Sequence, residues 1–214
     1  MLLKFTTKNY RSLRDEAVLD LEAAGLGDHK ECLLKFKRNP YLPVVSINGK
    51  NGGGKSNVIR AMWLAVQFIK NAQRTQHETA EVPVTPFELN DYSYKEPSSF
   101  EFEYENDGVR YNYGFSATRE CISEEHLYWA PNGQKSVVFD RSYQKFTFPV
   151  NADKKVKEMI SKAVAPNQLF FAISCMMNYE PCIKAMRWFR TKVFFSRDYS
   201  DLGKNILDYG EDKD

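Results

Sequence analysis

Alternating apolar and polar positions divide the chain into short strands at the start, a long β region in the middle and helices towards the end. Near the N-terminus, Leu3 and Phe5, and then residues 17–21, alternate with polar residues on either side of a polar bend at residues 9–14. A period of two is typical of half-buried strands, so we expect two short strands around an exposed turn that carries Arg11. Residues 22–40 contain glycines and a small basic cluster, and we interpret them as a surface connection.

The next segment changes from strand to helix across a run of glycines. Residues 41–47, Y-L-P-V-V-S-I, have the composition of a buried strand. Beyond the glycines, the apolar residues Ile59, Met62, Val66 and Ile69 follow at spacings of three, four and three, which predicts a helix that runs to about residue 71. Strand, glycine-rich loop and helix is the order that a phosphate-binding loop requires.

The middle of the chain predicts an antiparallel meander. Residues 75–97 are polar, contain three prolines and are expected to form a long loop. From residue 98 the aromatic residues alternate with polar ones on both sides of the turn at residues 106–108, which predicts a hairpin. Further strands are expected at residues 122–129, 136–139 and 144–148. Helical spacing returns at residues 156–163 and 183–189, with Pro181 in a first turn.

Composition narrows the class of protein. The 214 residues are 43% apolar, 27% charged and 14% aromatic, which indicates a globular fold and excludes a disordered or fibrous chain. Thirty basic against 28 acidic side chains are too balanced to indicate nucleic acid by bulk charge. Four cysteines lie far apart without a C-x-x-C pair, so reduced thiols are the simplest expectation. No signal peptide or membrane span is evident, and we expect a cytoplasmic protein that does not associate with a membrane.

The glycine run carries the clearest chemistry. Residues 49–56 read G-K-N-G-G-G-K-S and match the P-loop pattern G-x-x-x-x-G-K-[ST] at every fixed position. Glycines let backbone N–H groups curl around a phosphate, and the N-terminus of the following helix faces the same spot. Lys55 can reach the β- and γ-phosphates, and the Ser56 hydroxyl can ligate Mg²⁺. We therefore expect ATP and Mg²⁺ as ligands, held by Gly49, Lys50, Asn51, Gly52, Gly53, Gly54, Lys55 and Ser56.

Two segments carry a family resemblance. Residues 49–57 resemble the G-x-N-G-x-G-K-S-N form of ABC-type ATPases of the SMC, RecF and OLD group. The bend Asn9-Tyr-Arg-Ser12 resembles the N-F-R-S segment that precedes the P-loop in the same group. Bacterial AAA-family ATPases of this ABC-like type, some of them from phage-defence operons, also insert an antiparallel β-lobe after the P-loop helix, and residues 98–150 look like that insertion. The resemblance adds Asn57 to the nucleotide-binding residues and implies that Arg11 lies near the nucleotide; an exposed turn arginine is the alternative.

The resemblance also implies a fold and a domain order. We expect an α/β fold, namely an ABC-like P-loop NTPase lobe with an antiparallel β-meander insertion. Residues 1–74 would form the N-terminal strands, the P-loop and its helix, and residues 75–97 a loop. Residues 98–150 would form the insertion, and residues 151–214 a helical segment that leads towards a second ATPase lobe missing from this sequence.

Other parts of an ABC-type site are not found in the sequence. There is no Walker B strand ending in Asp-Glu, no L-S-G-G-Q-like signature and no suitable switch histidine. Ser136 to Asp140 offers an apolar run and a carboxylate, but Arg141 follows where a catalytic glutamate belongs, so we interpret it as a strand end of the insertion. Gln168 could occupy a Q-loop and contact Mg²⁺, or be a polar turn residue. No catalytic residue is identified, and the chain is expected to bind ATP better than it hydrolyses it until those motifs complete it.

Three functions remain open. The first is an ATP-binding lobe that acts by ATP-dependent dimer closure in DNA-linked or phage-defence processes. Its partner would be a second copy, the missing ATPase half or an effector subunit such as a nuclease. The second is an ATP sensor without catalysis, and the third is a P-loop kinase for a small substrate. A basic stripe from Lys184 to Arg197 with interleaved aromatics could contact nucleic acid, or its aromatics could be core and its charges solvated.

Overall fold

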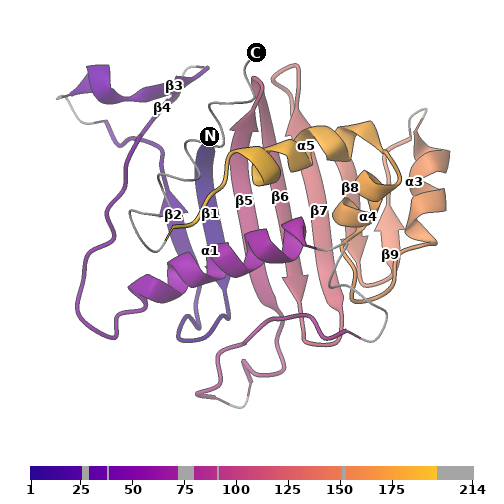
Figure 1. Cartoon of the computed structure of the whole chain (residues 1–214), viewed down its shortest axis with the longest axis horizontal. Coiled ribbons are helices and arrows are strands. Elements are labelled where there is room, and N and C mark those ends of the chain that lie inside the picture. Colours follow the sequence, from indigo (N-terminus) through magenta and orange to yellow (C-terminus); the bar gives the residue numbers. More distant parts are fainter. Residues whose placement is uncertain (26–28, 38, 72–79, 91, 151–152, 197–214) are drawn as a thin grey trace.

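One antiparallel sheet organises the fold (Figure 1). The computed structural model describes residues 1–25, 29–37, 39–71, 80–90, 92–150 and 153–196. Within them, the sheet has the strand order β2-β1-β5-β6-β7-β8-β9. The strands are β1 (Leu2–Lys8), β2 (Ala17–Asp20), β5 (Ser98–Asn106), β6 (Val109–Ala117), β7 (Ile122–Ala130), β8 (Ser136–Ser142) and β9 (Lys145–Thr147).

The expected N-terminal strands and the expected meander share this sheet. β1 pairs with β2 on one side and with β5 on the other, where Phe5 lies opposite Phe102. Strand alternation places Phe102, Tyr104 and Tyr113 on one face and the glutamates of β5 on the other. The β region from residue 98 is therefore a continuation of the N-terminal strands.

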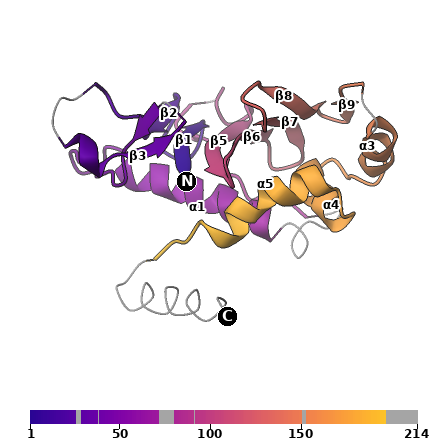
Figure 2. The same ribbon diagram turned by 90° about the horizontal axis from the view of Figure 1, so that it is seen from above.

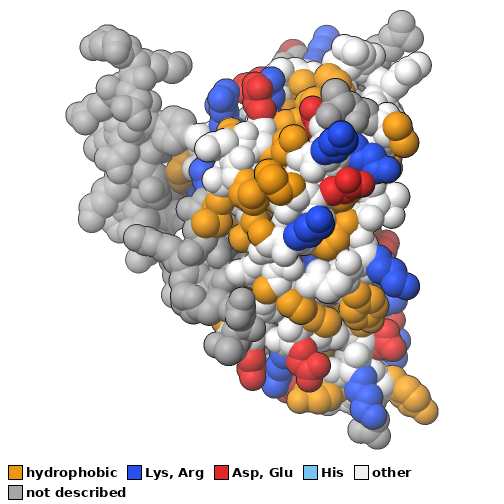
Figure 3. All heavy atoms as spheres, turned by 90° about the vertical axis from the view of Figure 1, so that its right-hand side faces the viewer, with side chains coloured by type: hydrophobic (Ala, Val, Ile, Leu, Met, Phe, Trp, Pro, Cys, Tyr) orange, Lys and Arg blue, Asp and Glu red, His pale blue; other side chains and the backbone are white. Residues whose placement is uncertain are grey.

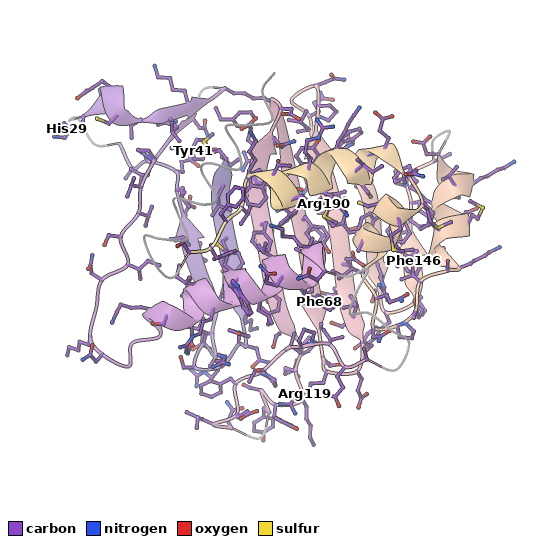
Figure 4. The ribbon with its side chains drawn as sticks, viewed as in Figure 1. His29, Tyr41, Phe68, Arg119, Phe146 and Arg190 are labelled. Atoms are coloured by element: carbon purple, nitrogen blue, oxygen red, sulfur yellow. The ribbon has the colours of Figure 1, made fainter. Side chains whose placement is uncertain are left out.

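Helices cover one face of the sheet (Figure 2). They are α1 (Lys55–Lys70), α4 (Phe170–Met176) and α5 (Glu180–Thr191), while α3 (Lys154–Ser161) lies beside β9. Phe68 of α1 (Figure 4) packs on Phe115 with ring centroids 5.7 Å apart. Phe189 of α5 packs on Phe102 with ring centroids 5.2 Å apart. The predicted helices at residues 59–71, 156–163 and 183–189 are confirmed, and Pro181 lies in the first turn of α5.

A buried ion pair joins the meander to the helices. Glu125 of β7 and Arg141 of β8 lie opposite each other in the sheet, with 3.3 Å between Arg141 Nη1 and Glu125 Oε2 and both side chains fully buried. The Glu125 carboxylate also accepts the N–H groups of Phe170 and Phe171 at 2.8 and 2.9 Å, so it fixes the start of α4. Removing either charge would leave the other buried without compensation.

The region before the P-loop departs from the sequence prediction in one respect, the expected buried strand, and adds a hairpin that the sequence did not indicate. A hairpin of β3 (Leu34–Phe36) and β4 (Asn39–Tyr41), preceded by the 3₁₀ helix η1 (Lys30–Cys32), lies inside the expected surface connection. The expected buried strand at residues 41–47 forms only its first residue, because residues 42–48 are irregular and Val44 is 80% exposed. A strand needs a neighbour for its N–H and C=O groups, and residues 43–48 find none among the described residues.

The β9 end of the sheet exposes apolar side chains. α3 buries Ile160 and exposes Val156 and Met159, and Val150 before it is also exposed. Figure 3 shows apolar side chains on this face, with lysine and arginine side chains between them. The sheet therefore ends on an amphipathic surface at this edge.

Candidate nucleotide-binding site

The loop from Gly49 to Gly54 has a backbone that only glycines adopt easily. Gly49, Gly52 and Gly54 have φ values of 155°, 80° and 83°. L side chains rarely occupy this region, so a Cβ at these positions would strain the loop whatever the surrounding space. The three glycines therefore set the shape of this loop.

The loop and the start of α1 present a group of unused backbone donors. Asn57 and Val58 donate to the carbonyl of Gly54 at 2.8 and 3.2 Å. By contrast, several N–H groups have no acceptor among the described residues, namely those of residues 51, 52, 54, 55 and 56. Gly54 precedes the helix without a side-chain cap, and the first turn carries no acidic residue. Open donors at the positive end of a 16-residue helix form a suitable environment for phosphate oxygens.

Lys55 and Ser56 open α1 directly after the glycine loop. The Lys55 ammonium folds back over the loop and donates to the carbonyls of Gly49 and Lys50 at 2.7 and 2.6 Å. The exposed Ser56 hydroxyl has no hydrogen-bond partner among the described residues. In the described part of the chain no group of three metal-ligating side chains occurs, so a bound Mg²⁺ would complete its coordination with phosphate oxygens and water.

The N-terminal bend lies against the P-loop. Asn57 donates from Nδ2 to the Ser12 hydroxyl at 2.6 Å. A Cβ at Gly54 would lie 3.0 Å from Cδ2 of Leu13, so the bend approaches the loop as closely as a glycine permits. Arg11 occupies the same bend, is exposed and has no carboxylate partner within the described residues. The structure therefore brings the bend that carries Arg11 next to the loop.

Asn9 is a residue whose role the sequence pattern did not reveal. It is 3% exposed and its amide donates to the carbonyls of Ser93 and Glu96 at 2.7 and 2.8 Å. Its Oδ1 accepts the N–H of Phe87 at 3.0 Å, and its own carbonyl accepts the Ser98 hydroxyl. The only available signal was an asparagine at a bend, which tolerates its φ of 53°.

Gln168 lies elsewhere. Its side-chain oxygen accepts the N–H of Ala165 at 3.0 Å, and its carbonyl accepts Arg141 at 2.5 Å. It precedes α4, and α4 and the first turn of α1 lie at opposite ends of the sheet (Figures 1 and 2). The structure does not bring Gln168 to the P-loop, and a contact with Mg²⁺ stays a prediction.

Asp140 belongs to a strand, as interpreted from the sequence. It lies in β8 and accepts the hydroxyl of Tyr128 on the neighbouring β7. Arg141, the residue after it, is buried with Glu125. This stretch is part of the meander and its carboxylate is already hydrogen-bonded.

Part of the basic stripe near the C-terminal end is accounted for by packing and surface pairs. Trp188 is 3% exposed and belongs to the core. Lys184 pairs with Glu180 on the same helix, and Arg187 pairs with Asp107. Arg190 extends from α5 (Figure 4), whereas Arg197 lies outside the described residues. Arg190 and Lys192 are exposed and have no ion-pair partner among the described residues, and contact of the stripe with nucleic acid stays a prediction.

The cysteines are all free thiols, as expected. Cys175 and Cys182 are buried between α4 and α5, and burial raises the pKa of Cys175 to about 12. A protonated, buried thiol is a poor nucleophile and a poor metal ligand. These residues therefore serve the core.

Comparisons with known proteins add the family. A family model described as "AAA domain, putative AbiEii toxin, Type IV TA system" matches residues 44–198. Comparison with curated proteins gives no match. Among the described helices, none is long and apolar enough to span a membrane. The family match includes the whole P-loop, α1 and the strands from β5 onwards. Because it covers more than half of the sequence, this chain belongs to that family of AAA-domain proteins, which have the P-loop NTPase fold and bind nucleotides.

Proposed function

We propose that this chain binds Mg·ATP through residues 49–57. The observation that carries the proposal is the set of N–H groups at residues 51, 52, 54, 55 and 56, at the positive end of α1, which have no acceptor among the described residues. The Lys55 ammonium already lies over the loop and needs only to exchange two carbonyl acceptors for phosphate oxygens. Mg²⁺, when bound beside Ser56, would neutralise phosphate charge, and Arg11 would approach the nucleotide from the bend.

Calorimetry tests this proposal directly. The native chain should bind Mg·ATP, and Lys55→Ala should weaken binding about 10- to 100-fold, since a hydrogen bond to a charged group contributes about 1.5–3 kcal/mol. Lys145→Ala removes an exposed lysine of β9 and should bind like the native chain. Equal affinities of Lys55→Ala and the native protein would refute the assignment.

We further propose that these residues supply binding rather than turnover. Hydrolysis needs a carboxylate that positions metal and water, and no hydrogen bond or ion pair joins a carboxylate to Lys55 or Ser56 among the described residues. ATP hydrolysis would then require a Walker B carboxylate and a signature motif supplied from outside the described residues. The same observation favours an ATP sensor as the second candidate, whereas nothing described favours a kinase.

An uncovered apolar surface supports a partner. Val44, Val45 and Ile47 before the P-loop, and Ile59 and Trp63 on α1, are exposed. We propose that a second copy or another ATPase half covers this surface when ATP closes the assembly, as an ABC-like ATPase would. A DNA-linked or phage-defence role with a nuclease-like effector is proposed on the family resemblance alone.

A further inference from the structure

A polar groove of about 670 Å³ lies on the sheet face opposite the helices. The floor of the groove is a row of five residues, one from each of five neighbouring strands, which lie opposite one another in the sheet. In strand order the row consists of Lys8, Ser99, Ser116, Glu124 and Ser142. Strand alternation points these side chains away from the core. The groove is separate from the P-loop and contains none of its residues.

The charges in the groove favour a cationic ligand. Arg14 and Asp15 form an ion pair at 2.8 Å and neutralise each other. The carboxylates of Glu96 and Glu124 then remain against the single ammonium of Lys8, and neither has an ion-pair partner among the described residues. Serine hydroxyls beside them can accept hydrogen bonds from a further cation.

Two tyrosines stand at the groove with their rings in solvent. Tyr92 is 84% exposed and Tyr143 is 57% exposed. An aromatic face next to a free carboxylate is a suitable contact for a guanidinium or ammonium group. The side chains therefore point to arginine or lysine as the group recognised.

Tyr143 adopts a strained backbone conformation, although burial of its ring contributes little stability because the ring is mostly exposed. It has a φ of 52° in the two-residue turn between β8 and β9, a position that favours glycine or asparagine. Its backbone is held there, because its N–H donates to Ser123 at 2.7 Å and its carbonyl accepts Arg141 at 2.6 Å. A bulky ring in this conformation, left in solvent, is the kind of strain that gathers at binding sites.

We propose that this groove binds an arginine- or lysine-bearing segment of a partner protein. The cation lies over the Tyr143 ring and pairs with Glu124, while the serine row takes hydrogen bonds from the segment. Binding at this groove does not require ATP, so the peptide experiment tests it separately from the proposed nucleotide binding.

The probe is the peptide acetyl-Arg-Gly-Arg-amide. Its binding is measured by the changes that it causes in the backbone amide chemical shifts of the nucleotide-free protein. We expect saturable shifts that cluster at Ser99, Ser116, Glu124 and Tyr143. Glu124→Gln and Tyr143→Asn should each weaken binding several-fold, and Tyr143→Asn should not lower Tm because asparagine accepts the turn conformation. Glu158→Gln on α3, outside the groove, should bind like the native protein.

Three outcomes would overturn the proposal. The first is the absence of saturable shifts at millimolar peptide. The second is equal binding of acetyl-Glu-Gly-Glu-amide, which would show that the groove does not select a cation. The third is unchanged affinity in both groove variants while their amide spectra remain those of the folded protein.

Discussion

Asn9 adopts a left-handed backbone and turns its side chain into the loop at residues 85–97. The described residues of that loop, 85–90 and 92–97, form neither helix nor strand, so their carbonyl and N–H groups lack the partners that regular structure supplies. The Asn9 side-chain amide bonds three of these groups: it donates to the carbonyls of Ser93 and Glu96 and accepts the N–H of Phe87. The neighbouring residues of the same bend reach the P-loop, so Asn9 also anchors the bend that approaches the nucleotide site.

Asn9→Ala should lower the free energy of unfolding by about 2–4 kcal/mol, because it leaves several buried backbone groups without partners. Urea unfolding measures this change. Asn48→Ala is the matched control, since Asn48 is exposed and its side chain bonds, among the described residues, only to the Ser46 hydroxyl; it should change stability by less than about 0.5 kcal/mol. A loss no larger than the control would show that water satisfies the loop instead.

Elements with a strong local pattern formed as the sequence indicates. α1 has a helical period of apolar residues, and Met62, Val66 and Ile69 are buried as expected, while Ile59 is exposed. The hairpin of β5 and β6 turns at residues 106–108. In contrast, α4 was not expected, because its apolar run F-F-A-I-S-C-M shows no period that separates a buried helix from a buried strand.

A substitution at Gly54 tests how closely the N-terminal bend packs against the P-loop. Gly54→Ala places a Cβ 3.0 Å from Leu13 at a φ of 83°, so we expect a loss of about 1–3 kcal/mol of stability. ATP affinity should fall as well, because the donors of residues 54–56 would shift. Thermal unfolding and calorimetry measure the two effects.

Gly25→Ala serves as the control, because a Cβ there meets nothing within 4 Å and its φ is not in the strained region. It should leave both quantities unchanged. A Gly54→Ala protein with native stability and native ATP affinity would contradict the close fit.

The described part of the molecule is a sheet with helices on one face and, at one side, a segment whose residues 43–48 make no backbone hydrogen bond to another described residue. The segment at residues 42–48 leads straight into the P-loop, and it exposes main-chain groups together with Val44 at 80%. Trp63 on α1 is 43% exposed. Apolar surface next to a nucleotide site is a typical signature of an interface.

Val44→Asp combined with Trp63→Glu should reduce association, because two charges would have to lose water at the interface. Sedimentation velocity with saturating Mg·ATP measures the distribution of species. The two positions are exposed, so Tm should change little. Val150 is 91% exposed at the β9 end of the sheet, away from the proposed interface. Val150→Asp is therefore the control and should associate like the native chain. Identical sedimentation of all three proteins would remove the proposed interface.

The sequence by itself determined the P-loop, α1 and the strand alternation of the meander, because each depends on residues that are close together in the chain. Only the tertiary structure decided that β1 pairs with β5, that Glu125 meets Arg141, and that Gln168 lies away from the loop. It also decided that residues 42–48 form no strand among the described residues, although their composition is that of one. The physical reason is that strand pairing and ion pairing depend on which distant segment becomes the neighbour, and local periodicity carries no information about that choice.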